Sequence, residues 1–378
     1  MRAIRVGLFT YGMAQQLTGI GTYTMELAYA LKRLNDPPEV ILLSPYPQSP
    51  LKWYRDFPVH LVPSLKRLPG VMMHGSRVLS RVGQKVGLDI LHDPCGIAPF
   101  ENTQGPMARV VTIHDAIPLV HPELQPFGTR VVYRTTLRRA RWTSNAVITV
   151  SRHARSDLTK TLRIPSHKLF VTPMGTHIPS LNQLRQWRQE LPARLSHLGV
   201  KQPYFLWVGT DTPRKNLRRV LAAFERVKQD HPEINLILIG PNGRTMWPEG
   251  VQHLGYVHPG ERSCLYVGSL GLVFPSLYEG FGLPILEAMA HGTPVITSHA
   301  ASMPEVGGQA ALMVDPYSVP DIELAMRRCL STEVRARLGF EGRIRAMRFS
   351  WDETARKTLQ VYRWALGQQS WGIEEMLP

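Results

Sequence analysis

The chain has 378 residues, which is too long for a typical single core and suits two domains. Its content of 43% hydrophobic and 19% charged residues is typical of a folded globular protein. It contains no run of about 20 apolar residues and no signal-peptide pattern, which argues against a membrane-spanning helix and against export. The three cysteines, Cys95, Cys264 and Cys329, are far apart in the sequence. This spacing argues against a disulfide framework and a zinc site, and it favours a reducing cytoplasm.

The net charge of +15 is unevenly distributed. Residues 1–200 hold 25 Lys and Arg against 11 Asp and Glu, whereas residues 201–378 hold 19 against 18. The first half is therefore attracted to polyanions, which include nucleic acids, anionic membrane surfaces and phosphate-bearing acceptors. A basic nucleic-acid-binding protein is one alternative, but no helix-turn-helix, zinc-finger or RNA-binding signature accompanies the charge, so no nucleic acid is expected.

The first predicted elements are a strand, a glycine loop and a helix. Residues 4–10 form an apolar run typical of a buried parallel strand, and Gly19 and Gly21 open a helix that extends to about residue 34. The loop is too long for a dinucleotide-binding fingerprint, and the third glycine of that motif is missing. Further buried strands are predicted at residues 40–44, 88–92, 110–113, 147–150 and 169–172. This succession predicts a doubly wound α/β domain.

Residues 71–86 combine an apolar side with a basic side. The apolar side comprises Val71, Met72, Val78, Leu79, Val82 and Val86. The basic side comprises Arg77, Arg81 and Lys85. Two interpretations are open: the apolar side inserts into an anionic membrane surface, or the helix covers the sheet with its basic side in water. A second helix, over residues 127–142, presents either a solvated face or an extension of the basic surface. Its basic residues are Arg130, Arg134, Arg138 and Arg141.

His114 and Asp115 follow the strand at residues 110–113, at the edge where open parallel sheets collect ligands. In that position a histidine can hydrogen-bond a ligand or stabilise developing charge, although a lone histidine is more often structural. A second domain begins with the strand at residues 204–208, which leads into Gly209 and a basic turn. Strands at residues 235–239 and 251–256 follow and are suited to form a nucleoside pocket.

Residues 272–297 predict a strand, a loop, a short helix and another strand. Gly280 and Gly282 open the backbone, the helix starts near Pro284, and Gly292 closes it. A helix amino terminus behind a glycine loop is a favourable seat for a phosphate. Glu279, on the loop, is suited to accept hydrogen bonds from sugar hydroxyls, and Glu287, one turn inside the helix, from a ribose. The alternative is that neither glutamate binds a ligand: one would be only a structural cap and the other a solvated position on the helix.

The two glutamates, separated by seven residues, resemble the donor-site motif of the family-4 retaining glycosyltransferases. Residues 208–217 are similar to the pyrophosphate-binding segment of that family, and residues 112–118 to its amino-terminal histidine segment. Residues 147–151 and 19–23 resemble its next strand and its first glycine loop. The segments occur in the family order from about residue 4 to residue 352, so the resemblance covers nearly the whole chain.

The resemblance implies the GT-B fold, an α/β arrangement of two doubly wound Rossmann-like domains that face each other across a cleft. The expected acceptor domain is 1–178, with a linker at 179–202. The expected nucleotide-sugar domain is 203–350, and residues 351–378 are expected to form a helix that crosses back to the first domain.

The resemblance also implies site residues. Catalytic roles are expected for His114, Lys215 and Glu279. Donor binding is expected from Arg214, Lys215, Gly280, Phe281, Gly282, Leu283 and Glu287, with Gly19 and Gly21 in the amino-terminal glycine loop. Thr210 departs from the pattern, because relatives often carry an arginine there, so the division of phosphate charge between Arg214 and Lys215 stays open. No aspartate-x-aspartate triplet is present, and no metal or other cofactor is expected.

The implied reaction is hexosyl transfer from a nucleotide sugar with retention of anomeric configuration. The motif segments look most like those of bacterial mannosyl- and rhamnosyltransferases of surface-polysaccharide assembly, which makes GDP-mannose the expected donor. A UDP- or dTDP-sugar donor and a sugar-nucleotide epimerase of the same fold remain alternatives. The basic first half fits a glycan or lipid-linked acceptor and a peripheral location at the inner face of the membrane, where an anionic surface is an expected partner.

Overall fold

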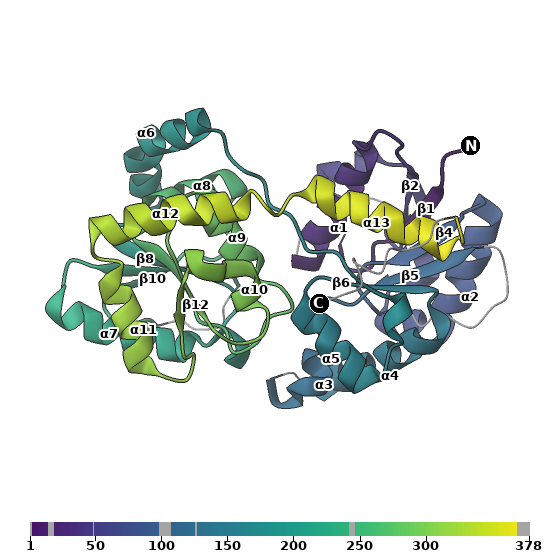
Figure 1. The fold of residues 1–378 in the computed structure, drawn as a ribbon. Coiled ribbons are helices and arrows are strands. Elements are labelled where there is room, and N and C mark those ends of the chain that lie inside the picture. The colour runs from purple at the N-terminus through teal and green to yellow at the C-terminus, as the bar shows by residue number, and fades with distance from the viewer. Residues whose placement is uncertain are drawn as a thin grey trace. The chain divides into compact units, whose positions relative to one another are not determined.

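The computed structural model describes residues 2–13, 19–47, 49–97, 107–124, 127–241 and 246–368. The chain forms two compact units, each of which contains its own parallel sheet (Figure 1). The first unit comprises Met1–Gly175 and Ser350–Pro378, and the second comprises Thr176–Phe349. The expectation of two doubly wound α/β units is confirmed.

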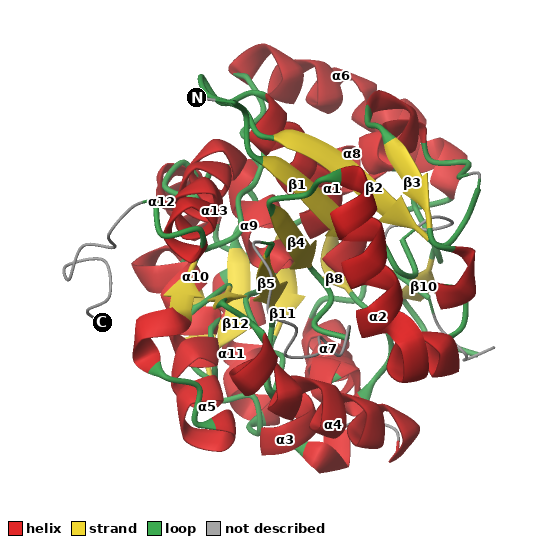
Figure 2. Cartoon of the chain, turned by 90° about the vertical axis from the view of Figure 1, so that its right-hand side faces the viewer, coloured by secondary structure: helices red, strands yellow, loops and turns green. Residues whose placement is uncertain are grey.

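In the first unit, the described strands pair in parallel in the order β3-β2-β1-β4-β5-β6-β7. Figure 2 shows β1, β2 and β3 adjacent at one end of this sheet. The strands are β1 (Arg5–Phe9), β2 (Glu39–Ser44), β3 (Val59–Leu61), β4 (Ile90–Asp93), β5 (Ala108–Thr112), β6 (Ala146–Thr149) and β7 (Leu169–Val171). The helices are α1 (Gly19–Lys32), α2 (Leu68–Val86), α3 (Ile117–Val120), α4 (Phe127–Thr143), α5 (Arg152–Leu162) and α13 (Trp351–Ala365).

In the second unit, the described strands again pair in parallel, in the order β10-β9-β8-β11-β12-β13. The strands are β8 (Tyr204–Val208), β9 (Asn235–Ile239), β10 (Val251–His253), β11 (Gly271–Phe274), β12 (Val295–Ser298) and β13 (Leu312–Val314). The helices are α6 (Leu181–Leu198), α7 (Leu217–Asp230), α8 (Pro259–Gly268), α9 (Leu283–Ala290), α10 (Met303–Gly307), α11 (Val319–Arg328) and α12 (Thr332–Ala346).

The last helix, α13, packs on the first unit, where it contacts α1, β5 and β6 (Figure 1, yellow). A buried polar contact joins it to the sheet: His92 Nδ1 lies 2.7 Å from Tyr362 Oη, and His92 Nε2 lies 2.8 Å from Thr112 Oγ1. Gly175 lies so close to this helix that an added Cβ would come within 2.1 Å of the Trp351 backbone nitrogen. The end of the first unit therefore needs a glycine.

Residues 179–202, expected to be a linker, contain α6 and belong to the second unit. Ser180 and Gln183 form a reciprocal capping box at the start of α6, and Gly199 ends the helix with φ 65°. Leu184 and Leu195 are buried, and α6 packs against α8. A helix of 18 residues thus replaces the expected connection.

The apolar side of α2 faces the core of the first unit, so it is not available for insertion into a membrane. Val71 and Leu79 are fully buried, and Val78, Val82 and Val86 pack against the same core cluster. The Met72 side chain lies outside the described part. The basic residues Arg77, Arg81 and Lys85 are exposed. Of the two interpretations, the structure therefore supports a helix that covers the sheet with its basic side in water.

Candidate active site

The candidate site of the second unit lies where two neighbouring strands end. β8 leads into a turn at Pro213–Lys215 and then α7, and β11 leads into the loop before α9. Because β8 and β11 pair in parallel, both loops leave the same edge of the sheet. The sequence thus brings the basic turn and the Glu279 loop together.

Glu279 lies between the two cations of the basic turn. Its Oε1 is 2.6 Å from Arg214 Nη1 and 2.7 Å from Lys215 Nζ. Burial alone would raise the pKa of the Glu279 carboxyl, but the charges of Lys215 and Arg214 outweigh burial and hold the pKa below its usual value. Burial lowers the pKa of Lys215, although the Glu279 carboxylate opposes that shift. Two cations and one carboxylate leave an excess positive charge in this cluster.

Backbone contacts fix the two loops to each other. The Leu277 N–H donates to Arg214 O at 2.8 Å, and Arg214 Nη1 donates to Tyr278 O at 3.2 Å. Asn216, in the left-handed region with φ 58°, donates from Nδ2 to Pro275 O at 3.0 Å. These contacts hold the cluster in place without a ligand, which lowers the cost of ordering it on binding.

The loop and start of α9 form a buried amino terminus next to the cluster. Gly280, Phe281 and Gly282 are buried, and Gly282 has φ 115°, which favours glycine. Ser302 Oγ donates to Glu279 O at 2.9 Å and Phe281 O at 2.8 Å, which fixes the loop. Helix α9 starts at Leu283 without a side-chain cap in the described structure. The start of this helix behind a glycine loop matches the placement that the sequence predicts for it.

Glu287 lies one turn inside α9, and its partners differ from those of Glu279. Tyr266 Oη donates to Glu287 Oε2 at 3.1 Å, and Arg262 Nη2 lies 3.3 Å from Glu287 Oε1. Both partners come from α8 and are four residues apart, so they share one helix face. Sequence reasoning missed them, because no motif around α8 marks them as part of a site.

His114 lies in the first unit, just after β5, and neighbouring groups fix its tautomer. Nε2 lies 2.8 Å from Pro94 O, a carbonyl oxygen that can only accept, so Nε2 carries the proton. The His114 and Tyr23 rings meet in a T-shaped arrangement, with the centroids 4.8 Å apart and an interplanar angle of 88°. Burial lowers the pKa of His114 to about 4, and the bond to Pro94 opposes that shift. His114 is thus neutral at pH 7, and its buried Nδ1 has no partner among the described residues.

The amino-terminal glycine loop lies close to His114. Gly19 and Gly21 are in the first turn of α1, which places Tyr23 on the His114 ring. A small cavity of about 140 Å³ adjoins the histidine, and Ile20, Cys95, Asp115 and Tyr133 contribute to its wall. In the second unit Arg214, Lys215 and Glu279 thus form one cluster, and Glu287 lies on the helix that follows. In the first unit His114 lies against Tyr23 of the helix that begins with Gly19 and Gly21.

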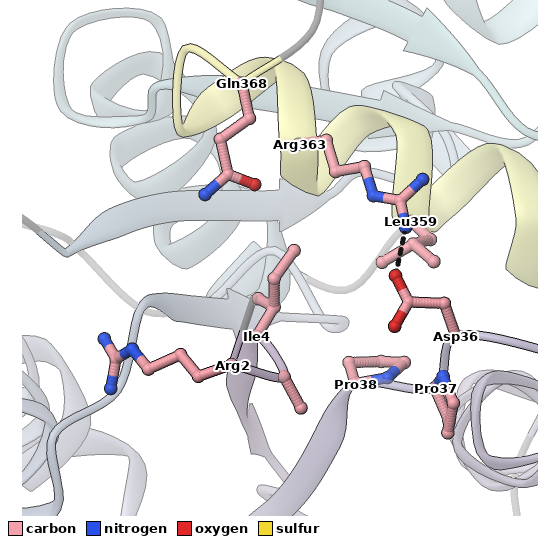
Figure 3. Close-up of a pocket in the computed structure, with 9 residues that line it drawn as sticks. Arg2, Ile4, Asp36, Pro37, Pro38, Leu359, Arg363 and Gln368 are labelled. Atoms are coloured by element: carbon pink, nitrogen blue, oxygen red, sulfur yellow. Dashed lines mark hydrogen bonds and ion pairs between the residues drawn. The ribbon is translucent and has the colours of Figure 1, made fainter.

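A larger pocket of about 370 Å³ lies elsewhere in the first unit (Figure 3). Ile4 and Pro38 in its wall precede β1 and β2, so it lies at the amino ends of these strands. Asp36 and Arg363 form an ion pair of 2.6 Å across it. Open parallel sheets bind their ligands at the carboxyl ends, so this pocket is not the candidate site.

Within the described ranges, no group of three or more His, Cys, Asp or Glu side chains is arranged to hold a metal ion. Nor does that part of the chain contain a helix long and apolar enough to cross a membrane.

Comparisons with known proteins identify the family. Residues 17–178 match the family model "Glycosyltransferase Family 4", and residues 195–345 match "Glycosyl transferases group 1". The chain is 30% identical to the O-antigen chain mannosyltransferase B of Escherichia coli, over 92% of this chain and 96% of that protein. It is 26% identical to the MMP alpha-(1->4)-mannosyltransferase of Mycolicibacterium hassiacum, over 97% and 99% of the two chains.

Solved structures agree on the fold. The sucrose-phosphate synthase of Thermosynechococcus elongatus superimposes with a TM-score of 0.78 at 19% identity, over 97% of this chain and 100% of that one. The motif segments, the two parallel sheets and these matches lead to one conclusion: the chain belongs to the family-4 glycosyltransferases.

Proposed function

We propose that the protein is a retaining mannosyltransferase that uses GDP-mannose and extends a glycan or a lipid-linked acceptor. The observation that carries the proposal is the cluster of Arg214, Lys215 and Glu279 beside the amino terminus of α9. Such a cluster suits a diphosphate, whose negative charge grows as the sugar leaves. The mannosyl group is supported by the names of the two relatives that match nearly the whole chain.

Each residue of the cluster has a separate task in this reaction. Lys215 meets the diphosphate as a point charge, and Arg214 chelates its oxygens through the planar guanidinium. Glu279 orients both cations and accepts hydrogen bonds from the sugar. The main chain from Gly280 to Leu283 receives the remaining donor oxygens. Because these groups neutralise the leaving diphosphate, the proposed reaction requires no metal or other cofactor.

His114 contributes an acceptor rather than a charge. With its proton on Nε2 and a pKa of about 4, its Nδ1 carries a lone pair at neutral pH. That lone pair accepts a hydrogen bond from a sugar hydroxyl, and it cannot donate one. Of the two roles expected from the sequence, this tautomer favours hydrogen bonding to the ligand.

We further propose that the first unit docks on the anionic inner face of the membrane through charge. The exposed basic residues of α2 support this, as does Trp142, which is 68% exposed at the end of α4 with the Arg141 guanidinium 4.3 Å from its ring. Arg134 and Arg138 are exposed on the same helix, whereas the Arg130 side chain lies outside the described part. Arginines and an exposed tryptophan suit a headgroup layer.

A transfer assay tests the proposed function. The purified protein is incubated with GDP-mannose, UDP-glucose or dTDP-rhamnose, with and without a lipid-linked mannosyl acceptor. We expect GDP release only from GDP-mannose with acceptor, and an α-linked product by NMR. Release of the nucleotide from UDP-glucose or dTDP-rhamnose instead would show that the donor carries uridine or thymidine rather than guanosine. Conversion of the sugar nucleotide without release of the nucleotide would identify an epimerase instead.

A further inference from the structure

Three aromatic rings of the second unit stack in a column that begins in α6 and ends at Glu287. The Trp187 and His291 rings are 5.2 Å apart at an interplanar angle of 27°. The His291 and Tyr266 rings are 5.3 Å apart at 29°. The imidazole therefore lies between the indole and the phenol, and the Tyr266 hydroxyl lies at the end of the column.

Hydrogen bonds fix the middle ring of this column, and burial fixes the inner one. His291 Nδ1 donates to Glu287 O at 2.7 Å, and its Nε2 accepts from Ser263 Oγ at 3.1 Å. Thr293 Oγ1 donates to the Tyr266 carbonyl at 2.7 Å. Tyr266 is only 1% exposed, so its ring has one packed position.

The fixed phenol donates to a carboxylate that still has free lone pairs. A carboxylate has about four lone-pair sites, two on each oxygen. Tyr266 occupies one on Oε2 and Arg262 one on Oε1, so each Glu287 oxygen can still accept from a ligand hydroxyl. Glu287 is 22% exposed in its side chain, which leaves it within reach of a ligand.

The two partners of Glu287 differ in how firmly they are held. Tyr266 is packed in the column, whereas the Arg262 side chain is 36% exposed. Burial, followed by the Glu287 charge, raises the pKa of Tyr266 well above its usual value, so the hydroxyl remains a donor at neutral pH. Without that donor, Arg262 alone would set the orientation of the carboxylate. Because the long Arg262 side chain has several rotamers, it would hold the carboxylate in one orientation less firmly than Tyr266 does.

We propose that Tyr266 is a positioning residue that orients the Glu287 carboxylate to accept hydrogen bonds from the two hydroxyls of a nucleotide ribose. The proposal rests on the proposed function and on the ribose-binding role that the sequence leads us to expect for Glu287, and it adds the group that directs the carboxylate. The column extends the binding site to Trp187 of α6, a helix that the sequence suggested was only a linker.

The test compares a ribonucleotide with an analogue that lacks both ribose hydroxyls. Calorimetry measures the dissociation constants of GDP and 2′,3′-dideoxy-GDP for the parent, Tyr266→Phe and Tyr204→Phe. Tyr204 is a matched control, because it is fully buried in the same unit and its hydroxyl donates to Leu265 O at 2.9 Å. The ratio of the two constants isolates the energy of the ribose hydroxyls from effects on the rest of the site.

We expect the parent to prefer GDP by at least about tenfold, since hydrogen bonds to a charged group are strong. Tyr266→Phe should reduce this preference by about fivefold or more, mainly by weakening GDP, whereas Tyr204→Phe should keep it. Added to Glu287→Gln, Tyr266→Phe should have no further effect on GDP affinity, because the hydroxyl acts through the carboxylate. Trp187→Leu, at the half-buried end of the column, should lower the preference in the same direction.

Three results would overturn the proposal. One is an unchanged preference in both Tyr266→Phe and Trp187→Leu. Another is an equal weakening of both ligands, because that would make Tyr266 a purely structural residue. The third is an additive effect of Tyr266→Phe on Glu287→Gln. A parent that binds neither GDP nor UDP would instead refute the proposed function, and that outcome is visible before any variant is made.

Discussion

Replacement of Lys215 by methionine removes one charge from the diphosphate site and keeps most of the side-chain volume. The Lys215 side chain is 12% exposed, and its ammonium lies 2.7 Å from Glu279 and 4.4 Å from the centre of the Phe274 ring. The aliphatic part of methionine can occupy the same space. Glu279 keeps Arg214 as its ion-pair partner at 2.6 Å, so the carboxylate is not left buried alone.

The expected loss of affinity follows from the contact that is removed. A hydrogen bond to a charged group contributes about 1.5–3 kcal/mol, so the dissociation constant for GDP should rise by roughly 10- to 150-fold. The free energy of unfolding without ligand should change little, because loss of the ion pair is offset by relief of a buried ammonium.

Calorimetry with GDP measures the affinity, and thermal unfolding checks the fold. Lys201→Met is the matched control, since it removes the same charge from an exposed position of the same unit and should leave the affinity unchanged. A Lys215→Met protein that unfolds at the parental temperature and binds GDP as tightly as the parent would remove Lys215 from the site. Equal weakening in the control would show that only net charge matters.

Three further outcomes follow from the structure. Burial lowers the pKa to about 3 or 4 in three histidines: His92, His114 and His291. Their folded pKa values lie below the unfolded value of about 6.5, so the contribution of these neutral histidines to the free energy of unfolding is fully present above pH 6.5. That contribution is lost as the pH falls towards 4, by up to about 1.4 kcal/mol per pH unit for each histidine. The Tm should therefore fall more steeply between pH 7 and pH 5 in the parent than in His92→Gln, and equal slopes would contradict this. Gly240→Ala should lower the free energy of unfolding by several kcal/mol, because φ is 129° and the new Cβ would lie 2.0 Å from Gly209 O. Gly255→Ala is the control: φ is 67° and no atom lies within 4 Å of the new Cβ, so the loss should be only about 1–2 kcal/mol. Thermal unfolding measures both. Arg77→Glu with Arg81→Glu should reduce sedimentation with anionic liposomes, and equal sedimentation of parent and variant would argue against docking through α2.

Much of the fold could be predicted because the buried strands are short apolar runs. Residues 204–208 and 235–239 were expected as strands and match β8 and β9 residue for residue. Proline and glycine marked the ends of α9 equally well, since Gly282 and Gly292 both have positive φ. These signals are local, so one sequence contains them.

The points that the sequence left open or missed depend on contacts between distant residues. The amphipathic pattern of α2 has the same form whether its apolar side meets a membrane or a sheet, and only packing against the core decides between them. The sequence interpretation treats residues 179–202 as a linker, whereas the structure has α6 there, a helix that includes Pro192 and buries Leu184 and Leu195. Its stability comes from its caps and from packing on α8.

The candidate site was predictable to the same extent. Glu279 and the basic turn stand out by type and spacing, and the parallel pairing of β8 and β11 explains why they meet. Tyr266 and Arg262 could not be found in this way. They act on Glu287 from a helix with no motif, and their role emerges only from the hydrogen bond and the ion pair.

The central claim is that a nucleotide sugar binds at Arg214, Lys215 and Glu279. The most direct measurement is thermal unfolding of the parent with guanosine, uridine, thymidine and adenosine diphosphate sugars, because it needs no acceptor. A ligand at 100 times its dissociation constant stabilises the folded state by about 2.7 kcal/mol. The account predicts saturable stabilisation by GDP-mannose that is much reduced in Lys215→Met. An unchanged Tm with every nucleotide sugar would contradict it.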